Sequence, residues 1–202
     1  MRSIFVVACI FALAVSSPSA DSSKKKPTKS MTPLNADEIV IYRTVLRQYV
    51  SDDRESLNVS ATTYPLDSTS PMDKLADSEC VKGIELENLE TVAHSFHNLR
   101  PDVLPGENMK LVDPKQQSKI ARANDPSETI RGGKSVDRAV RDAFDTALFS
   151  MSEIAFDKEH RFAVVSYSFW CGSLCGNGTT LVFEKVDGEW KKTNRNCGEW
   201  VS

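Results

Sequence analysis

The chain has 202 residues, of which 40% are hydrophobic and 26% charged, a composition typical of one soluble globular domain rather than a disordered or fibrous protein. Its formal net charge of −3 excludes the strongly basic surface that nucleic-acid binding requires, so we expect no nucleic-acid partner.

The first twenty residues have the layout of a secretory signal peptide. Arg2 precedes an uninterrupted apolar run from Ile4 to Val15, and small residues follow as far as Ala20. The apolar run is too short to span a bilayer, so we expect no transmembrane anchor. We therefore expect residues 1–20 to be removed and the mature protein, with Arg2 lost and a net charge of −4, to be secreted or periplasmic.

Residues 21–34 are predicted to be a flexible basic linker, because four lysines lie among Ser, Thr and Pro. Residues 35–202 then form a single domain. Asn35, with Glu38 three residues later, is typical of a helix N-terminus, and apolar residues at helical spacing predict a helix from 36 to about 50. Alternating apolar residues predict a strand from Leu57 to Tyr64.

Apolar residues from Ile84 to Phe96 predict a second helix that ends before Pro101. His94 and His97 in its last turn would share one helix face and are weak candidates for metal ligands. No Glu follows His94 as in the His-Glu-x-x-His zinc motif, so we favour no metal site and expect no cofactor.

Residues 102–134 are rich in Pro, Gly and charge, and they predict an irregular segment with one short strand at 109–112. A segment of this length is usually a functional surface or mobile. Ser135 is a suitable N-cap for a third helix from 136 to about 148, whose apolar residues recur every four positions: Val136, Val140, Phe144 and Leu148.

The last third of the chain predicts antiparallel strands. A turn over residues 157–160 would place Ile154 opposite Ala163 and Ser152 opposite Val165. Asp187-Gly188 is a strong hairpin signal that would place Glu184 opposite Lys191 and Lys185 opposite Trp190. The expected core face of the central strand contains Ala163, Val165, Tyr167 and Phe169, and the opposite face is apolar only at one end, at Phe162 and Val164.

The hairpin tip from Cys171 to Gly178 is the most distinctive surface of the sequence. A bond between Cys171 and Cys175 would shape this loop locally, and its glycines permit the tight backbone. The functional alternatives for the tip are a rigid recognition loop, a thiol–disulfide switch or half of a metal site. We favour a disulfide ring whose role is structural. The residues that such a recognition loop would present are Gly172, Ser173, Leu174, Gly176 and Asn177.

Outside the leader the chain has four cysteines, an even number that favours disulfides in an oxidising compartment and allows three pairings. No catalytic residues are predicted. A nucleophile elbow is missing because Leu174 occupies its central position, and phosphate loops and dinucleotide fingerprints are absent as well.

The pattern Cys171-Gly172-x-Leu174-Cys175-Gly176, followed by Gly188-x-Trp190 and the terminal Trp-Val-Ser, resembles the C-terminal module of an uncharacterised family of exported bacterial proteins. The resemblance covers about the last fifty residues and implies bacterial export, but no activity. Cys80 and Cys197 are additions to the usual cysteine pair of that module. This implies a bridge between Cys80 and Cys197, with the tip pair closing on itself.

We expect an α+β fold in which a C-terminal antiparallel meander of about four strands, joined by the strand at Leu57, packs against three helices on one face. The expected function is a non-enzymatic binding or inhibitory module that presents the disulfide-closed tip to an envelope protein. The alternatives are a thiol-redox or metal-binding envelope protein, or a hydrolase without a recognisable motif.

Overall fold

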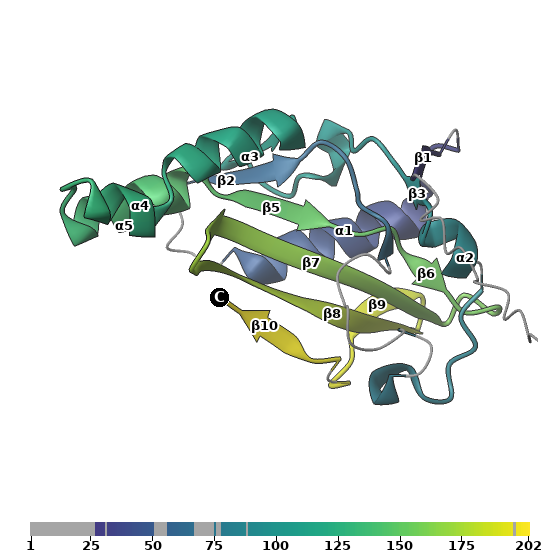
Figure 1. Cartoon of the computed structure of the whole chain (residues 1–202). Helices are drawn as coiled ribbons and strands as arrows, with labels where there is room; N and C mark the ends of the chain where they lie inside the picture. The colour runs from purple at the N-terminus through teal and green to yellow at the C-terminus, as the bar shows by residue number, and fades with distance from the viewer. Residues whose placement is uncertain are drawn as a thin grey trace, which may run out of the picture.

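The protein has an α+β fold built on a large mixed sheet, as a computed structural model of residues 27–30, 32–50, 56–66, 75, 78–87, 89–195 and 197–202 shows (Figure 1). The predicted leader and the start of the predicted linker lie outside these residues. The helices are α1 (Ala36–Tyr49), the short η3 (Glu79–Val81), α2 (Leu89–Val92), η4 (Pro101–Val103), α3 (Pro114–Ala123), α4 (Pro126–Arg131) and α5 (Val136–Thr146). The strands are β1 (Thr28–Lys29), β2 (Leu57–Ser60), β3 (Ser95–Phe96), β4 (Met109–Val112), β5 (Leu148–Met151), β6 (Ala155–Phe156), β7 (Phe162–Gly172), β8 (Cys175–Val186), β9 (Glu189–Lys192) and β10 (Glu199–Val201).

The main sheet has the strand order β10-β8-β7-β5-β2-β4, and β6 and β9 pair with β7 and β8 respectively. Its C-terminal strands β5 to β10 pair antiparallel with one another. The predicted strand at Leu57 joins this sheet as β2, which runs parallel to both β4 and β5. The sheet is therefore mixed and extends beyond the antiparallel strands of the last third.

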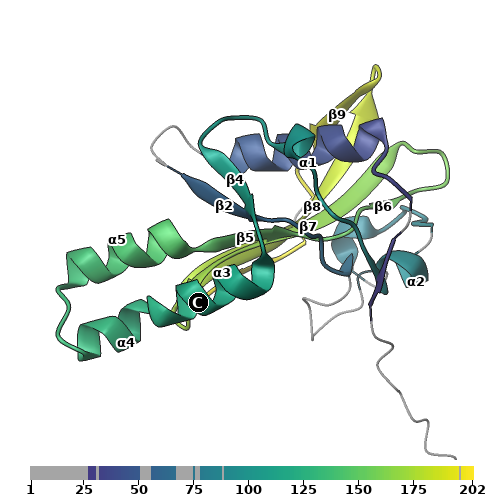
Figure 2. The same cartoon turned by 90° about the horizontal axis from the view of Figure 1, so that it is seen from above.

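Helix α1 covers one face of the sheet (Figure 2). Its predicted N-terminus is confirmed: the Asn35 side chain accepts from Glu38 N, and the Glu38 carboxylate accepts from Asn35 N. The buried side of the helix packs against the core face of β7 and β8, which includes Phe169 and Phe183. The buried residues of α1 are Ile41, Tyr42, Val45 and Leu46.

The core face predicted for β7 is confirmed, because Ala163, Val165 and Phe169 are buried and Tyr167 packs against the same cluster. On the opposite face of the sheet the predicted apolar end is confirmed, because Val164 is buried. There Val164 and Val182 pack against the segment around η3 in a second, smaller core.

The hairpin at Asp187-Gly188 has the predicted register, with Glu184 opposite Lys191 and Lys185 opposite Trp190. Both turn residues have positive φ, 53° and 83°, which Asp and Gly tolerate better than other residues do.

The register predicted for the preceding turn is wrong. Phe156, not Ile154, lies opposite Ala163. The Asp157 carboxylate accepts hydrogen bonds from the N–H groups of Arg161 and Phe162, so Asp157 ends the strand and the turn moves one residue onward. Met151 then pairs with Tyr167, so the register shifts again before β5.

The long second helix predicted from Ile84 to Pro101 is also wrong. Of the residues that the structure describes in this stretch, only α2 (Leu89–Val92) is helical, and β3 (Ser95–Phe96) pairs in parallel with β1. Thr28 and Lys29 of the predicted linker are therefore paired with the domain. The chain then continues along β2, where Leu99 N donates to Ala61 O.

The segment predicted to be irregular, 102–134, contains the expected strand β4 but also two helices, α3 and α4. Both begin with an aspartate N-cap followed by proline: Asp113 accepts from Gln116 N, and Asp125 accepts from Ser127 N. Proline is favoured at the first helical position because its missing N–H would be unpaired there in any case.

The helices do not all cover one face of the sheet. Helix α1 lies on the face of Phe169, whereas α3 lies on the other side, where the Arg122 guanidinium is 5.9 Å from the centre of the Trp170 ring (Figure 2). Helices α3, α4 and α5 together form an arm that extends past the end of the sheet.

Candidate functional site

The tip of the β7–β8 hairpin is a two-residue turn, Ser173-Leu174, between the paired residues Gly172 and Cys175. A disulfide joins Cys171 to Cys175 directly below this turn. Gly172 has a φ of 149°, and a Cβ atom there would lie 2.7 Å from Pro126 Cδ at the start of α4. The tip therefore rests closely against the arm, and glycine is the residue that fits.

Asp125 fastens the tip to the arm. It is 4% exposed, and its carboxylate accepts from Ser127 N at 2.9 Å and Ser127 Oγ at 2.6 Å. It also accepts from Ser173 N at 2.6 Å and Ser173 Oγ at 2.7 Å. The bonds from Ser127, together with those from Ser173, hold the pKa of the Asp125 carboxyl well below its usual value, against the opposing effect of burial.

We expect Asp125→Asn to lower the free energy of unfolding by about 1 to 2 kcal/mol at neutral pH, since the amide caps α4 but cannot accept all four bonds. The folded pKa of Asp125 lies below the unfolded value of about 3.9, so its stabilisation is complete above that pH and is lost as the pH falls further. Denaturant titrations should show the difference between the variant and wild type shrinking below about pH 4.

Asp113→Asn is the matched control, because Asp113 caps α3 ahead of a proline but is an exposed cap whose side-chain bond is to Gln116 N. It should change stability little, since Asn and Asp are similar N-caps. A loss in Asp125→Asn that stays constant from neutral to acidic pH would show that the carboxylate charge is not what holds the tip.

Two of the predicted recognition residues, Ser173 and Leu174, are exposed. Leu174 is 75% exposed at the apex of the turn. Ser173 is bonded to Asp125, and Asn177 lies within β8, paired with both Phe169 and Val201. Sequence reasoning alone did not find Asp125, which is 48 residues from Ser173.

The two remaining glycines of the tip region lie under the C-terminal strand. A Cβ atom at Gly178 would lie 2.5 Å from Trp200 Nε1, and one at Gly176 would lie 3.2 Å from the Trp200 ring. These glycines thus make room for Trp200, so their role is packing. The remaining candidate for recognition is Leu174, on a turn that the Cys171–Cys175 bond and Asp125 hold in place.

The other two cysteines form a second disulfide, Cys80–Cys197, which spans 117 residues. It joins the segment around η3 to the chain just before β10, over the end of the sheet that Val164 and Val182 occupy. The two disulfides join the cysteine pairs that the resemblance to exported bacterial proteins implies.

His94 and His97 do not form a pair on one helix face, because α2 ends before them and β3 lies between them. His97 Nδ1 lies 2.8 Å from Glu153 Oε2, and its backbone N–H donates to Glu153 Oε1 at 3.0 Å. Glu153 is 3% exposed and also accepts from the hydroxyl groups of Thr63 and Ser95. The acceptor capacity of this carboxylate is thus filled from within the protein.

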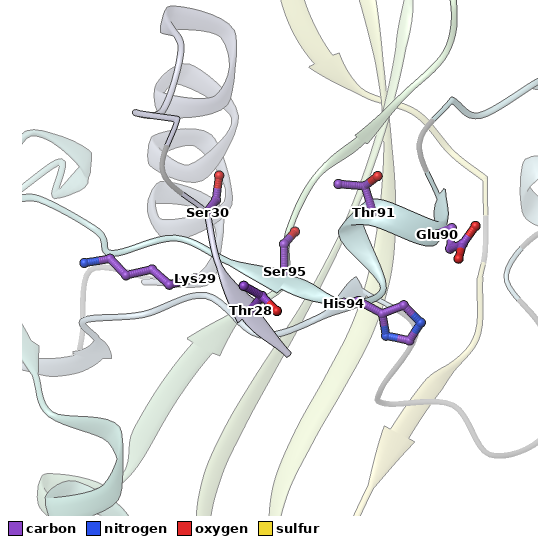
Figure 3. Close-up of a pocket in the computed structure, with 7 residues that line it drawn as sticks. All are labelled: Thr28, Lys29, Ser30, Glu90, Thr91, His94 and Ser95. Atoms are coloured by element: carbon purple, nitrogen blue, oxygen red, sulfur yellow. The ribbon is translucent and has the colours of Figure 1, made fainter. Parts of the chain in front are cut away.

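His94 lies at the edge of a hollow of about 300 Å³ between β1 and α2 (Figure 3). The side chains of Lys29 and Glu90 extend away from one another there, so the charged groups do not converge on one point. The hollow is lined by Thr28, Lys29, Ser30, Glu90, Thr91, His94 and Ser95.

Over the part of the chain that the structure describes, no three His, Cys, Asp or Glu side chains are grouped so that they could hold a metal ion. Among the same residues, no helix is both long and apolar enough to cross a bilayer. A scan against models of protein families, a search of curated proteins and a search of solved structures each find no match to this chain.

Proposed function

We propose that this protein is an exported, non-enzymatic binding module that uses Leu174 to dock on an envelope protein. The single observation that carries the proposal is that a leucine is 75% exposed at a turn whose two flanks are both fixed. The Cys171–Cys175 bond holds one side, and Asp125 holds the other through Ser173.

A fixed apolar residue suits recognition for a thermodynamic reason. A loop that is ordered before it binds loses little conformational entropy on association, so more of the burial energy of its anchor residue appears as affinity. Burying a leucine side chain contributes roughly 1.5 to 3 kcal/mol, enough to make it a central contact in an interface. The partner is therefore expected to present an apolar pocket.

Export is part of the same proposal. It is supported by the signal-peptide pattern of residues 1–20 and by two disulfides, which persist in oxidising compartments. The resemblance of the last fifty residues to exported bacterial proteins supports a partner in a bacterial envelope.

We expect Leu174→Asp to leave the melting temperature nearly unchanged and to abolish capture of the envelope partner. The experiment compares affinity capture from envelope extract by wild type, by Leu174→Asp and by the control Val40→Asp. Val40 is also an exposed apolar residue, 45% exposed, but it lies on α1. Support requires one identified protein that wild type and Val40→Asp capture and Leu174→Asp does not.

The same variants test the structural alternative. If Leu174→Asp lowers the melting temperature as much as Phe183→Ala, which empties a fully buried core position, Leu174 is a packing residue and the recognition role is lost. Equal capture by Leu174→Asp and wild type would also contradict the proposal.

A further inference from the structure

Helix α5 carries a row of exposed apolar side chains on the arm. Val136, Val140 and Phe144 are 58%, 40% and 44% exposed, and their spacing of four residues places them on one side of the helix. The side that is buried within the protein is a different one, formed by Ala139 and Ala143. We refer to Val136, Val140 and Phe144 as the α5 row.

The row begins at the sheet and continues outward along the arm. The ring of Phe144 lies 5.6 Å from that of Phe169, at the end of the sheet core. Figure 2 shows α5 extending from there past the end of the sheet, with α4 beside it. A row of this kind on a monomer surface usually marks an interface.

The charges beside the row point to its occupant. Asp137, Arg141 and Asp145 each follow a row residue by one position, so all three lie along the same edge of the row. When two identical helices pack antiparallel, each edge faces the same edge of its partner. An edge on which acidic and basic residues alternate can therefore place opposite charges against one another.

One register of the two helices pairs Asp137 with Arg141 twice. With the two-fold axis level with residue 139, Asp137 of each copy lies opposite Arg141 of the other, because the two positions are equally far from the axis. In this register Val136 lies three residues before the axis, Val140 one residue after it and Phe144 five residues after it. The same three residues of the partner lie three residues after the axis, one before it and five before it. Side chains of the two copies therefore alternate along the contact.

We propose that two copies of this chain associate through antiparallel pairing of α5, with the α5 rows interdigitated and Asp137 facing Arg141 twice. The two copies bury the same surface, so the assembly closes as a two-fold dimer. The helix has only 11 residues, which makes the interface smaller than that of a standard stable complex. The dimer should accordingly be weak and dependent on concentration.

A membrane surface is the less suitable occupant. Helices that lie on anionic membranes are rich in Lys and Arg on their polar side. Helix α5 instead has two arginines, Arg138 and Arg141, against three aspartates, Asp137, Asp142 and Asp145. This balance favours pairing with a like helix.

The test is sedimentation velocity of the disulfide-intact mature chain over a wide range of concentrations. Wild type should shift from monomer to dimer as the concentration rises. Val140→Asp should raise the dimer dissociation constant roughly a hundredfold or more, since each dimer loses two buried valines and gains two buried charges. Leu174→Asp is the control and should dimerise like wild type, which separates this inference from the proposed docking role of Leu174.

Charge reversal tests the register. Asp137→Arg and Arg141→Asp should each weaken the dimer about tenfold, because each places like charges opposite one another twice. The double variant should restore most of the lost affinity. Melting temperatures measured at low concentration check that each variant still folds.

Three results would overturn the inference. The first is a wild-type monomer at every concentration, and the second is a dimer that Val140→Asp leaves intact. The third is a double charge variant that dimerises no better than either single one. Binding of wild type, but not of Val140→Asp, to phosphatidylglycerol vesicles without any dimer would assign the α5 row to a membrane instead.

Discussion

Replacing Cys80 and Cys197 together by alanine is expected to lower the free energy of unfolding by about 4 to 5 kcal/mol. The bond spans 117 residues, and closing so long a loop removes much of the conformational freedom of the unfolded chain. A loss of that size is a large share of the total stability of an ordinary domain.

The tip disulfide provides a matched comparison within the same chain. Cys171 and Cys175 are separated by only 4 residues, so replacing both by alanine should cost less than about 3 kcal/mol. Urea titration of the two double variants measures both effects. Equal losses, or peptide mapping that joins Cys80 to a tip cysteine, would contradict this assignment.

The long disulfide also closes one end of the sheet. Cys80 and Val81 lie over Val164 and Val182, and the Arg195 guanidinium donates to the backbone carbonyl groups of residues 80 and 82. Without the covalent bond, the segment keeps those hydrogen bonds, the small apolar cluster and the backbone bond from Glu87 N to Phe156 O. Amide hydrogen exchange should then rise first in the strands beneath it, before the α1 side of the sheet is affected.

The features that sequence reasoning predicted correctly depend on neighbouring residues. The capping box of Asn35 and Glu38 and the turn at Asp187-Gly188 specify their own backbone conformation, so α1 and the β8–β9 hairpin were predicted at the right residues. The alternation along β7 was equally informative because a strand with one buried face repeats every two residues.

The failed prediction over residues 84–100 has a tertiary cause. Apolar spacing there suits a helix, but the backbone N–H of His97 donates to Thr63 and Glu153, which are far away in the sequence. Helix α2 therefore ends at Val92. The helices α3 and α4 were missed for a different reason, since their Asp-Pro starts at residues 113 and 125 are local signals that the overall polarity of the segment obscured.

The position of the candidate site could be predicted from the sequence, but the contacts that hold it could not. The glycines and paired cysteines identified the tip, and they predicted correctly that the ring is local. No local pattern relates Ser173 to Asp125, or Gly178 to Trp200, because those contacts exist only once the arm and β10 lie against the hairpin. These contacts with distant residues bind Ser173 and leave the Leu174 side chain exposed.

Glu153 is the buried group whose removal should have the next largest effect. Its carboxylate accepts from the side chain and the backbone of His97 and from the hydroxyl groups of Thr63 and Ser95. These donors come from two separate segments of the chain, around Thr63 and around Ser95, and Glu153 itself follows β5. A carboxylate beside a histidine can belong to a reaction site, but here both are enclosed, with side-chain exposures of 4% and 13%. The pair therefore joins the β2, β3 and β5 regions.

We therefore expect Glu153→Ala to lower the free energy of unfolding by about 3 to 5 kcal/mol, because it leaves several buried donors without an acceptor. Glu153→Gln should cost less, about 1 to 2 kcal/mol, since the amide retains one acceptor oxygen and can donate to a neutral His97 ring. Glu189→Ala is the control: Glu189 has a side chain 78% exposed, and its loss should change stability by less than about 0.5 kcal/mol. All three values come from urea titration at one pH. If Glu153→Ala is as stable as the control, the network does not hold these segments together, and Glu153 and His97 become candidates for reacting groups.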